Sequence, residues 1–504
     1  MNFKSISYYL SFFCFPISLL AFINILYSSY FDYFLSIDTY FTTLFSSLFI
    51  GLSLMYFGKD SPKKINFIEQ LFLIILVYSL TALLISIPFY LSNIQITFLN
   101  SFFESISGLT GTGFSTFKNI RYLDPTLILW RSSSQWIGGL YFLIFLIFIF
   151  SSKKFNYKMT YLTYLGNNNY NSIEYIKNNL LKIIIYYCVL SFGIFLLFNI
   201  SGIRLFNSLN ISMTLISGGG FLSTDSLSNI ISSNFQKIIF IMAMCLNMFN
   251  FYLVFNIFDT KILTREHKED LYLLYLTIIL IILIYLSNNN GLDLIISVIS
   301  SLSNSGLTLI KSNNLSLYFL FITIIGGSLI SNTSGIKLAR FYILLKITSS
   351  EIIKLISPNS IINKIFCSSD KKITDDNVKI SFLIFISFFL SLFILSSFLI
   401  LDNIGFEKSF KLSILTLTNT VNSELTVLVK VSIDSLKDFS NPISSSTKKL
   451  DKIKRLKKKE IKIRNEILTL SSVIFLSEEK IVLLITLFGL INFIISAEAI
   501  LRRI

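Results

Sequence analysis

Long apolar runs alternate with shorter, half-polar runs along this chain of 504 residues, and the alternation predicts its elements. A helix needs about 20 mostly apolar residues to cross a bilayer. Runs of that length lie at 8–30, 36–57, 67–91, 126–151, 178–200, 235–258, 270–287, 315–347, 377–402 and 479–501. The pattern therefore predicts an all-α polytopic membrane protein.

Between alternate pairs of these runs lie stretches that are too short to span a bilayer. They cover 97–110, 204–217, 291–303 and 406–418. Each ends in small or polar residues, which are poor helix formers. These four loops are Thr110-Gly111-Thr112-Gly113, Ser217-Gly218-Gly219-Gly220, Ser303-Asn304-Ser305-Gly306 and Thr418-Asn419-Thr420-Val421. Irregular backbone at membrane depth is tolerated only where protein or a water-filled cavity satisfies it, so we expect re-entrant pore helices whose loops line an interior.

The recurrence of span, short helix, loop and span divides the chain. Two N-terminal transmembrane helices within 1–60 stand outside the recurrence. We expect four repeats, related by pseudo-fourfold symmetry around one pore, at 61–158, 159–262, 263–350 and 351–504. The last repeat carries a basic insertion at about 431–468, with a lysine-dense run from Lys448 to Arg464. A solvated, partly helical insertion is typical of such a run, but a lipid-headgroup contact and an altered local topology stay open.

Composition supports the membrane class and sets an orientation. The chain is 53% hydrophobic and 14% charged, whereas soluble proteins average about 25% charged residues. Its net charge of +15 would suggest nucleic acid as a partner of a soluble protein. Here the basic residues gather on one side of the predicted spans, which indicates a cytoplasmic face and attraction to anionic lipid rather than nucleic acid. Both termini are then cytoplasmic, and the loops open to the outside.

Catalytic chemistry finds little support in the sequence. The four cysteines form no Cys-x-x-Cys pair, and His267, the single histidine, stands beside Arg265 and Glu266 in what we interpret as a solvated loop. An enzyme acting on lipid would need paired carboxylates or clustered histidines near the interface. We expect no catalytic residues, no bound cofactor and no metal other than a transported ion.

The loops have the chemistry that a potassium ion needs. A ring of backbone carbonyls replaces the hydration shell of the ion. Turning carbonyls inward calls for backbone angles that glycine reaches freely, and we expect Gly113, Gly220 and Gly306 to supply them. The C-terminal ends of the pore helices favour a cation. Val421 occupies the corresponding place in the fourth loop, where a β-branched residue resists a positive φ.

Three further motifs carry a resemblance to a known family. The first runs from Phe103-Glu104-Ser105 to Gly113, the second is Trp130-Arg131 followed by Gln135-Trp136-Ile137-Gly138-Gly139, and the third is Gly326-Gly327-Ser328 followed by Ser331 to Lys337 and Arg340. With their order and spacing, the chain resembles the TrkH/KtrB family of potassium-translocating subunits over essentially its whole length.

The resemblance implies potassium uptake across a bacterial inner (plasma) membrane, with the four loops as a selectivity filter. It implies a homodimer and a cytoplasmic nucleotide-binding regulatory partner of the TrkA/KtrA type. It also implies a gate formed by an intramembrane loop below the filter. The corresponding residues here are Ser331, Asn332, Thr333, Ser334, Gly335 and Lys337. Lys337 and Arg340 could equally be basic side chains that extend to the cytoplasmic interface.

Two departures from the family pattern concern the fourth repeat. Val421 replaces a filter glycine, and Leu490 stands where the family usually carries an arginine in the last span. We therefore expect weaker selectivity for potassium over sodium. A sodium-permeable or weakly selective cation transporter and a degenerate regulatory subunit remain alternatives.

Charged and aromatic residues flank the first loop. We expect Glu104, on the first pore helix, to hold the loop by accepting hydrogen bonds from backbone N–H groups rather than to bind the ion. Trp130, Arg131 and Trp136 begin the next span, where anchoring in an interfacial aromatic belt is the simplest interpretation.

Overall fold

The computed structural model describes most of the chain up to residue 420. The described residues are 2–33, 37–62, 65–94, 96–117, 119–150, 173–253, 267–285, 291–309, 316–357, 365–366, 372–401 and 404–420. Val421, the basic insertion, Leu490 and the expected last span lie outside them. The same holds for most of the basic residues from which the orientation was inferred.

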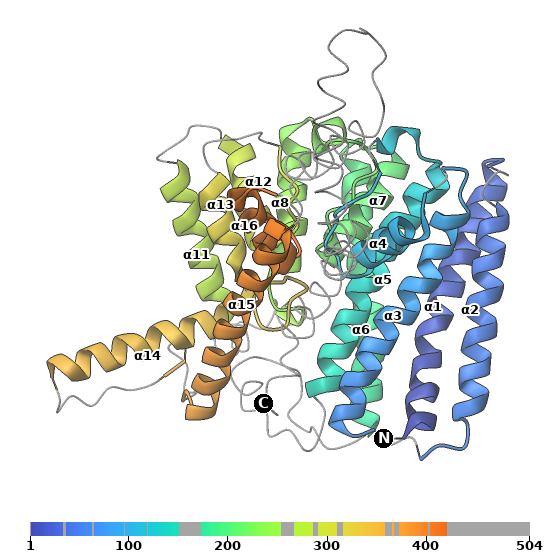
Figure 1. The fold of residues 1–504 in the computed structure, drawn as a ribbon. Helices are drawn as coiled ribbons and strands as arrows, with labels where there is room; N and C mark the ends of the chain where they lie inside the picture. Colours follow the sequence, from blue (N-terminus) through green and yellow to red (C-terminus); the bar gives the residue numbers. More distant parts are fainter. Residues whose placement is uncertain are drawn as a thin grey trace, which may run out of the picture.

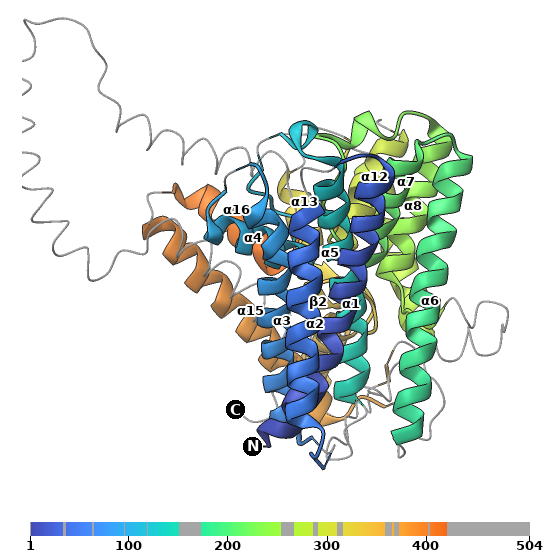
Figure 2. The same ribbon diagram turned by 90° about the vertical axis from the view of Figure 1, so that its right-hand side faces the viewer.

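Long helices form one side of the molecule (Figures 1 and 2). They are α1 (Phe3–Tyr30), α2 (Ile37–Gly58), α3 (Phe67–Leu91), α5 (Pro125–Phe150) and α6 (Ile173–Ile200). α1 packs against α2, α3 and α5. On the other side stand α11 (Lys268–Tyr285) and α15 (Asp375–Leu401).

Five helices in the described ranges are long and apolar enough to cross a membrane. They are Phe3–Tyr30, Ile37–Gly58, Ile68–Leu91, Leu180–Ile200 and Asp375–Leu401. Large apolar side chains remain exposed along them, for example Phe49 on α2 and Phe393 on α15. Apolar surface of this extent suits lipid rather than water, so this is an integral membrane protein.

Four short helices lie among the long ones, each within two residues of the bounds expected from sequence. They are α4 (Phe98–Leu109), α7 (Leu205–Ser217), α12 (Gly291–Leu302) and α16 (Phe406–Leu417). Their C-terminal halves are almost wholly buried, whereas their N-terminal turns are more exposed. In Figure 1, α4 and α7 lie on one side of the molecule, and α12 and α16 lie on the other.

The expected span at 235–258 ends early. Helix α8 covers Asn234–Met248, and Phe249 is extended with ψ 166°. The chain leaves the helix because its next groups bond elsewhere: the N–H of Phe251 donates to the carbonyl of Ile330 at 2.8 Å, and the carbonyl of Met248 accepts from Ser328 at 3.0 Å. A tertiary contact thus ends a helix that the apolar pattern would continue.

The expected span at 315–347 is broken, and the break begins earlier than Ser331. Helix α13 (Ser316–Ile324) leads into β1 (Ile325–Gly326), and β2 (Ile336–Lys337) leads into α14 (Leu338–Ile356). The two strands pair in parallel, Ile325 with Ile336 and Gly326 with Lys337. The segment between them is the 327–335 loop. α14 then runs outward from the body (Figure 1).

Candidate functional site

The four short helices end in the same backbone turn. The second residue of each loop is left-handed: Gly111 (φ 70°), Gly218 (φ 72°), Asn304 (φ 57°) and Asn419 (φ 49°). Its N–H donates to the carbonyl three residues earlier in all four loops. In the last three loops the next N–H donates five residues back, which is the hydrogen bonding of a left-handed helix cap. Glycine and asparagine are the residues that tolerate this conformation at least cost.

The expectation of a positive φ at the fourth residue of each loop is only partly right. Gly113 (φ 77°) and Gly306 (φ 69°) have it, and Gly220 does not. The sequence argument looked for glycine alone and therefore passed over Asn304 and Asn419. The sequence did carry a signal for the left-handed turn in these two loops, because an asparagine stands at the second position between two hydroxyl residues.

Loops that are neighbours in chain order are linked, three pairs directly and the second and third through Asn247 of α8. The Asn419 amide nitrogen lies 3.3 Å from the Thr110 carbonyl, and the Thr112 hydroxyl lies 3.3 Å from the Asn419 amide oxygen. The Asn304 amide lies 3.4 Å from the Thr420 hydroxyl. Thus the fourth loop joins the first and the third.

The second loop meets the first directly and the third through a side chain of α8. A Cβ on Gly111 would lie 3.7 Å from the carbonyl oxygen of Ser217, which places loops one and two in contact. Asn247 of α8 fills the space between loops two and three: its amide lies 3.5 Å from the Ser303 carbonyl and would lie 2.6 Å from a Cβ on Gly218.

Side-chain hydroxyls pair within three of the loops. The oxygens of Thr110 and Thr112 are 2.6 Å apart, those of Ser303 and Ser305 3.3 Å, and those of Thr418 and Thr420 2.9 Å. The second loop has Gly219 at the third position, where any Cβ would collide with the Gln135 amide. Gln135 accepts instead from the N–H of Phe221 at 3.2 Å.

A buried ion pair supports the first loop. Arg131 of α5 donates from Nε to Glu104 Oε1 at 2.8 Å, and both side chains are at most 1% exposed. Glu104 also accepts from the backbone N–H of Thr116 at 2.9 Å and from the Ser115 hydroxyl at 3.0 Å. The guanidinium lies 4.2 Å from the ring centroid of Phe221. The prediction that Glu104 holds its loop through a backbone N–H is therefore confirmed.

The aromatic-belt interpretation of Trp130 and Arg131 is wrong. The Trp130 side chain is buried, and its indole N–H donates to the carbonyl of Ile85 at 3.0 Å. Two glycines later on α5 allow close packing: a Cβ on Gly138 would collide with the Leu109 carbonyl, and one on Gly139 would lie 2.8 Å from Cα of Ser217. α5 thus packs directly on the ends of α4 and α7.

The 327–335 loop lies against the ends of the short helices. Asn332 donates to the carbonyl of Ile216 at 2.9 Å, and the Ser334 hydroxyl accepts from Asn419 at 2.9 Å. A cavity of about 10 Å³ remains between this loop and the first two loops. It is lined by Leu109, Thr110, Gly111, Gly138, Gly139, Phe142, Ser217, Asn332 and Ser334. This space is about that of one water molecule, too small for a hydrated ion.

Acidic residues at the start of α11 fix both breaks in the helices. Glu269 accepts from the N–H of Leu329 at 2.9 Å, and Asp270 accepts from the N–H of Asn250 at 2.9 Å. His267 lies 2.9 Å from Asp270 and is 1% exposed, so its placement in a solvated loop is wrong. Sequence reasoning missed Glu269 and Asp270, although carboxylates next to an apolar span are a recognisable signal of function.

Lys337 and Arg340 do not extend to the interface. Lys337 is 1% exposed and Arg340 is fully buried. The Lys337 ammonium bonds to Ser331 and Thr333 of the 327–335 loop. The interpretation of these two residues as basic side chains that extend to the cytoplasmic interface is therefore wrong. Lys337 instead bonds to the 327–335 loop.

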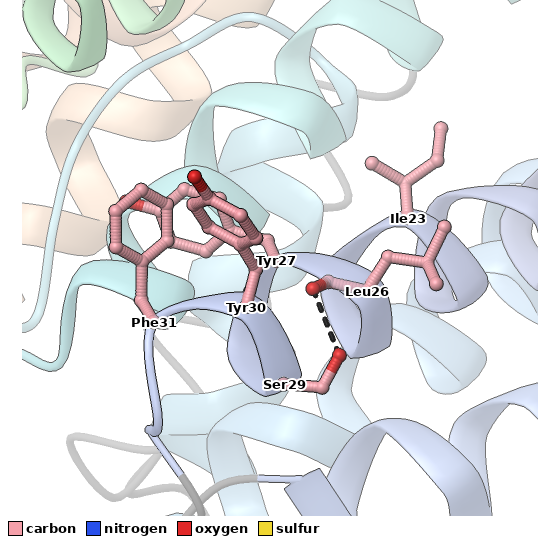
Figure 3. Close-up of a pocket in the computed structure, with 6 residues that line it drawn as sticks. All are labelled: Ile23, Leu26, Tyr27, Ser29, Tyr30 and Phe31. Carbon is pink, nitrogen blue, oxygen red and sulfur yellow. Dashed lines mark hydrogen bonds between the residues drawn. The ribbon is translucent and has the colours of Figure 1, made fainter.

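A second hollow lies apart from these residues. Figure 3 shows it at the C-terminal end of α1, lined by Ile23, Leu26, Tyr27, Ser29, Tyr30 and Phe31. The Tyr27 ring stacks on Phe206 of α7 at 6.1 Å between centroids. Aromatic and aliphatic side chains of this kind suit a membrane interface. Within the described ranges, three or more His, Cys, Asp or Glu residues nowhere gather as a metal site.

Curated proteins related to this chain are membrane transporters. An uncharacterized cation transporter of Methanocaldococcus jannaschii is 30% identical over 335 residues, 63% of this chain and 68% of the relative. The Trk system potassium uptake protein TrkG of Escherichia coli is 23% identical over 409 residues, 77% and 82% of the two chains. The corresponding protein TrkH of Salmonella typhimurium is 23% identical over 341 residues, 63% and 70%. No protein-family model matches the chain.

The fold has a counterpart among solved structures. The crystal structure of the potassium transporter TrkH from Vibrio parahaemolyticus superposes with a TM-score of 0.70 and 19% sequence identity, over 86% of this chain and 96% of that one. The fold and the sequence relatives indicate the same family. The chain belongs to the TrkH/KtrB family of potassium transporters, which is a family of transport proteins and not of enzymes.

Proposed function

We propose that this protein carries potassium into the cell through the ring of four loops. The observation that supports the proposal is the linked set of four loops: each follows a short helix, has the same left-handed turn and is tied to its neighbours directly or through Asn247. A left-handed turn at a helix end redirects the following carbonyls, and a ring of such carbonyls replaces the hydration shell of potassium. The relatives named as potassium uptake proteins support the same ion.

In this proposal the selectivity filter consists of residues 110–113, 217–220, 303–306 and 418–421. The short helices direct their negative ends toward the ring, which favours a cation there. The buried Glu104–Arg131 pair holds the first loop in shape and does not touch the ion. Potassium is the substrate.

The 327–335 loop, with Lys337, acts as the gate. It lies directly against the ring, and the space left beside it has no room for a hydrated ion. A polar, non-helical segment in the middle of an apolar span is a plausible moving part, because its hydrogen bonds can be exchanged for bonds to water when it swings away.

We further propose the setting in which the transporter works. The chain lies in a bacterial inner (plasma) membrane with both termini in the cytoplasm, as the lysine distribution suggests. It forms a homodimer, contacts anionic lipid through its basic side, and takes its regulation from a cytoplasmic nucleotide-binding subunit of the TrkA/KtrA type. Family resemblance supports these partners.

Rubidium uptake in a host that lacks its own potassium uptake systems tests the function. We expect uptake that depends on the chain and is inhibited more strongly by potassium than by sodium. The regulatory partner, when it is coexpressed, should change the rate. Equal inhibition by both ions would favour the weakly selective transporter, and the absence of any flux from the purified chain would favour a regulatory subunit.

We expect Val421→Gly to increase the preference for potassium over sodium several-fold. Valine restricts the fourth residue of its loop to negative φ, whereas glycine frees the backbone to match the first and third loops. The measurement is inhibition of rubidium uptake by each ion. Val421→Ala is the matched control, because it removes bulk but keeps the Cβ that restricts φ. An ion preference that is unchanged by glycine would remove valine as a determinant of selectivity.

A further inference from the structure

The ammonium of Lys337 lies in a cage of four oxygens. Nζ is 3.0 Å from the Ser331 carbonyl, 3.0 Å from the Ser331 hydroxyl, 2.6 Å from the Thr333 carbonyl and 3.1 Å from the Thr333 hydroxyl. Ser331, Thr333 and Lys337 are each 1% exposed. Two residues of the 327–335 loop thus surround a positive charge with backbone and side-chain oxygens.

The hydroxyl protons of the cage point away from the ammonium. The Ser331 hydroxyl donates to the Ser328 carbonyl at 2.7 Å, and the Thr333 hydroxyl lies 2.8 Å from the Ser331 oxygen, which can accept its proton. The N–H of Gly327 donates to the Thr333 oxygen at 2.9 Å. All four oxygens therefore present lone pairs inward. An ammonium has three protons for four acceptors, so at least one proton is shared.

The dimensions of the cage suit a large monovalent cation. Three of its four distances are 3.0–3.1 Å, longer than the roughly 2.0–2.1 Å of magnesium and the roughly 2.3–2.6 Å of calcium to oxygen. Glu269 accepts from the N–H of Leu329 in the same loop at 2.9 Å, which ties the loop to the start of α11. The position is otherwise unfavourable for a cation, since Lys337 caps the positive N-terminal end of α14.

We propose that this cage is a monovalent-cation site whose resident occupant is the Lys337 ammonium, and that the occupied cage holds the 327–335 loop in its folded shape. Without a cation, the buried carbonyl oxygens of Ser331 and Thr333 would lose the donor that the ammonium supplies, which is costly in an apolar setting. The loop would then open. Lys337 is a positioning residue: it acts on ion flow through the loop. The effect on ion flow rests on the proposed gate, whereas the cation site itself does not depend on that proposal.

The variant Lys337→Ala empties the cage. The part of the side chain that it removes corresponds to n-propylammonium, so this free cation can occupy the space. We expect the loop amides in the purified full-length chain to exchange hydrogen about tenfold faster in this variant, as the loss of a charge-assisted hydrogen bond predicts. Added n-propylammonium should restore protection in a saturable way, and choline, which has no N–H group, should not. The readout is hydrogen–deuterium exchange of peptides covering 327–338.

Two further variants separate charge from bulk and from general effects. Lys337→Met keeps the unbranched stem, one atom shorter, and removes the charge, so we expect fast exchange that n-propylammonium does not restore. It decides the question if Lys337→Ala fails to fold. Lys354→Ala, on the same helix, removes a lysine that pairs with Glu351 in an exposed position, and it should change nothing. Wild-type exchange in Lys337→Met, or no restoration by n-propylammonium in Lys337→Ala, would overturn the site.

Ion flow gives the second readout. Rubidium uptake should rise in Lys337→Ala and fall again when n-propylammonium is added, with no such response in Lys354→Ala. If exchange behaves as expected and uptake does not change, the cation site stands and the proposed gate is wrong. If exchange does not respond, the cation site is wrong whatever the uptake shows.

Discussion

We expect cells expressing a chain shortened within the 327–335 loop to take up rubidium about 30-fold faster than cells expressing the intact chain. Removing 332–334 deletes both contacts between the loop and the ring, from Asn332 to Ile216 and from Ser334 to Asn419. Each hydrogen bond is worth about 1 kcal/mol, and a shift of about 2 kcal/mol toward the open state is roughly 30-fold in population. The measurement is initial uptake, normalised to the amount of protein in the membrane.

A point variant keeps the loop length and isolates one contact. Asn332→Ala should raise uptake about fivefold, because it removes a single hydrogen bond of about 1 kcal/mol. Asn229→Ala, in an exposed turn far along the chain from the loop, is the matched control and should have no effect. Unchanged or lower uptake after both the deletion and Asn332→Ala would exclude the loop as a closed gate.

Loss of either member of the Glu104–Arg131 pair should abolish uptake and strongly destabilise the protein. Both side chains are buried, and removing one leaves the other as an uncompensated charge, which costs about 3–5 kcal/mol. We expect Glu104→Ala and Arg131→Ala each to lower the unfolding temperature in detergent and to eliminate rubidium uptake. The double variant should unfold at a higher temperature than either single variant, because no charge is left unpaired.

The matched control for this pair lies on another short helix. Glu407 pairs with Lys411 on α16, and the Glu407 side chain is 79% exposed. Such surface pairs contribute little to stability, so Glu407→Ala should leave the unfolding temperature and the uptake nearly unchanged. If Glu104→Ala were equally harmless, the buried pair would not be what holds the first loop.

The apolar pattern predicted where helices lie because burial in lipid requires length and hydrophobicity, and both are visible in sequence. The bounds of α4, α7, α12 and α16 follow for the same reason, since the small residues after them cannot continue a helix. The sequence did not show where helices end inside the protein. α8 ends at Met248 because the backbone there bonds to the 327–335 loop, and α13 ends at Ile324 where β1 pairs with β2; such pairings depend on the assembled fold.

Charged residues were the least predictable part of the site. Sequence neighbours suggested solvent around His267 and an interface around Arg131 and Lys337, but all three are buried beside specific partners. A buried charge requires a partner from another element, and a single sequence does not reveal which elements meet. Glu104 was predicted correctly because the loop that it supports follows it along the same chain segment.

One amide group in the ring has consequences for regulation. Asn419 donates both to the Thr110 carbonyl and to the Ser334 hydroxyl, so a single side chain touches the proposed filter and the proposed gate. If Ser334 moves away, the amide is free to bond more strongly to that carbonyl, and an ion that draws the carbonyl away from the amide strengthens the hold on Ser334. Coupling of this kind is reciprocal in free energy. We therefore expect the concentration of potassium outside the cell to adjust how readily the proposed pathway opens.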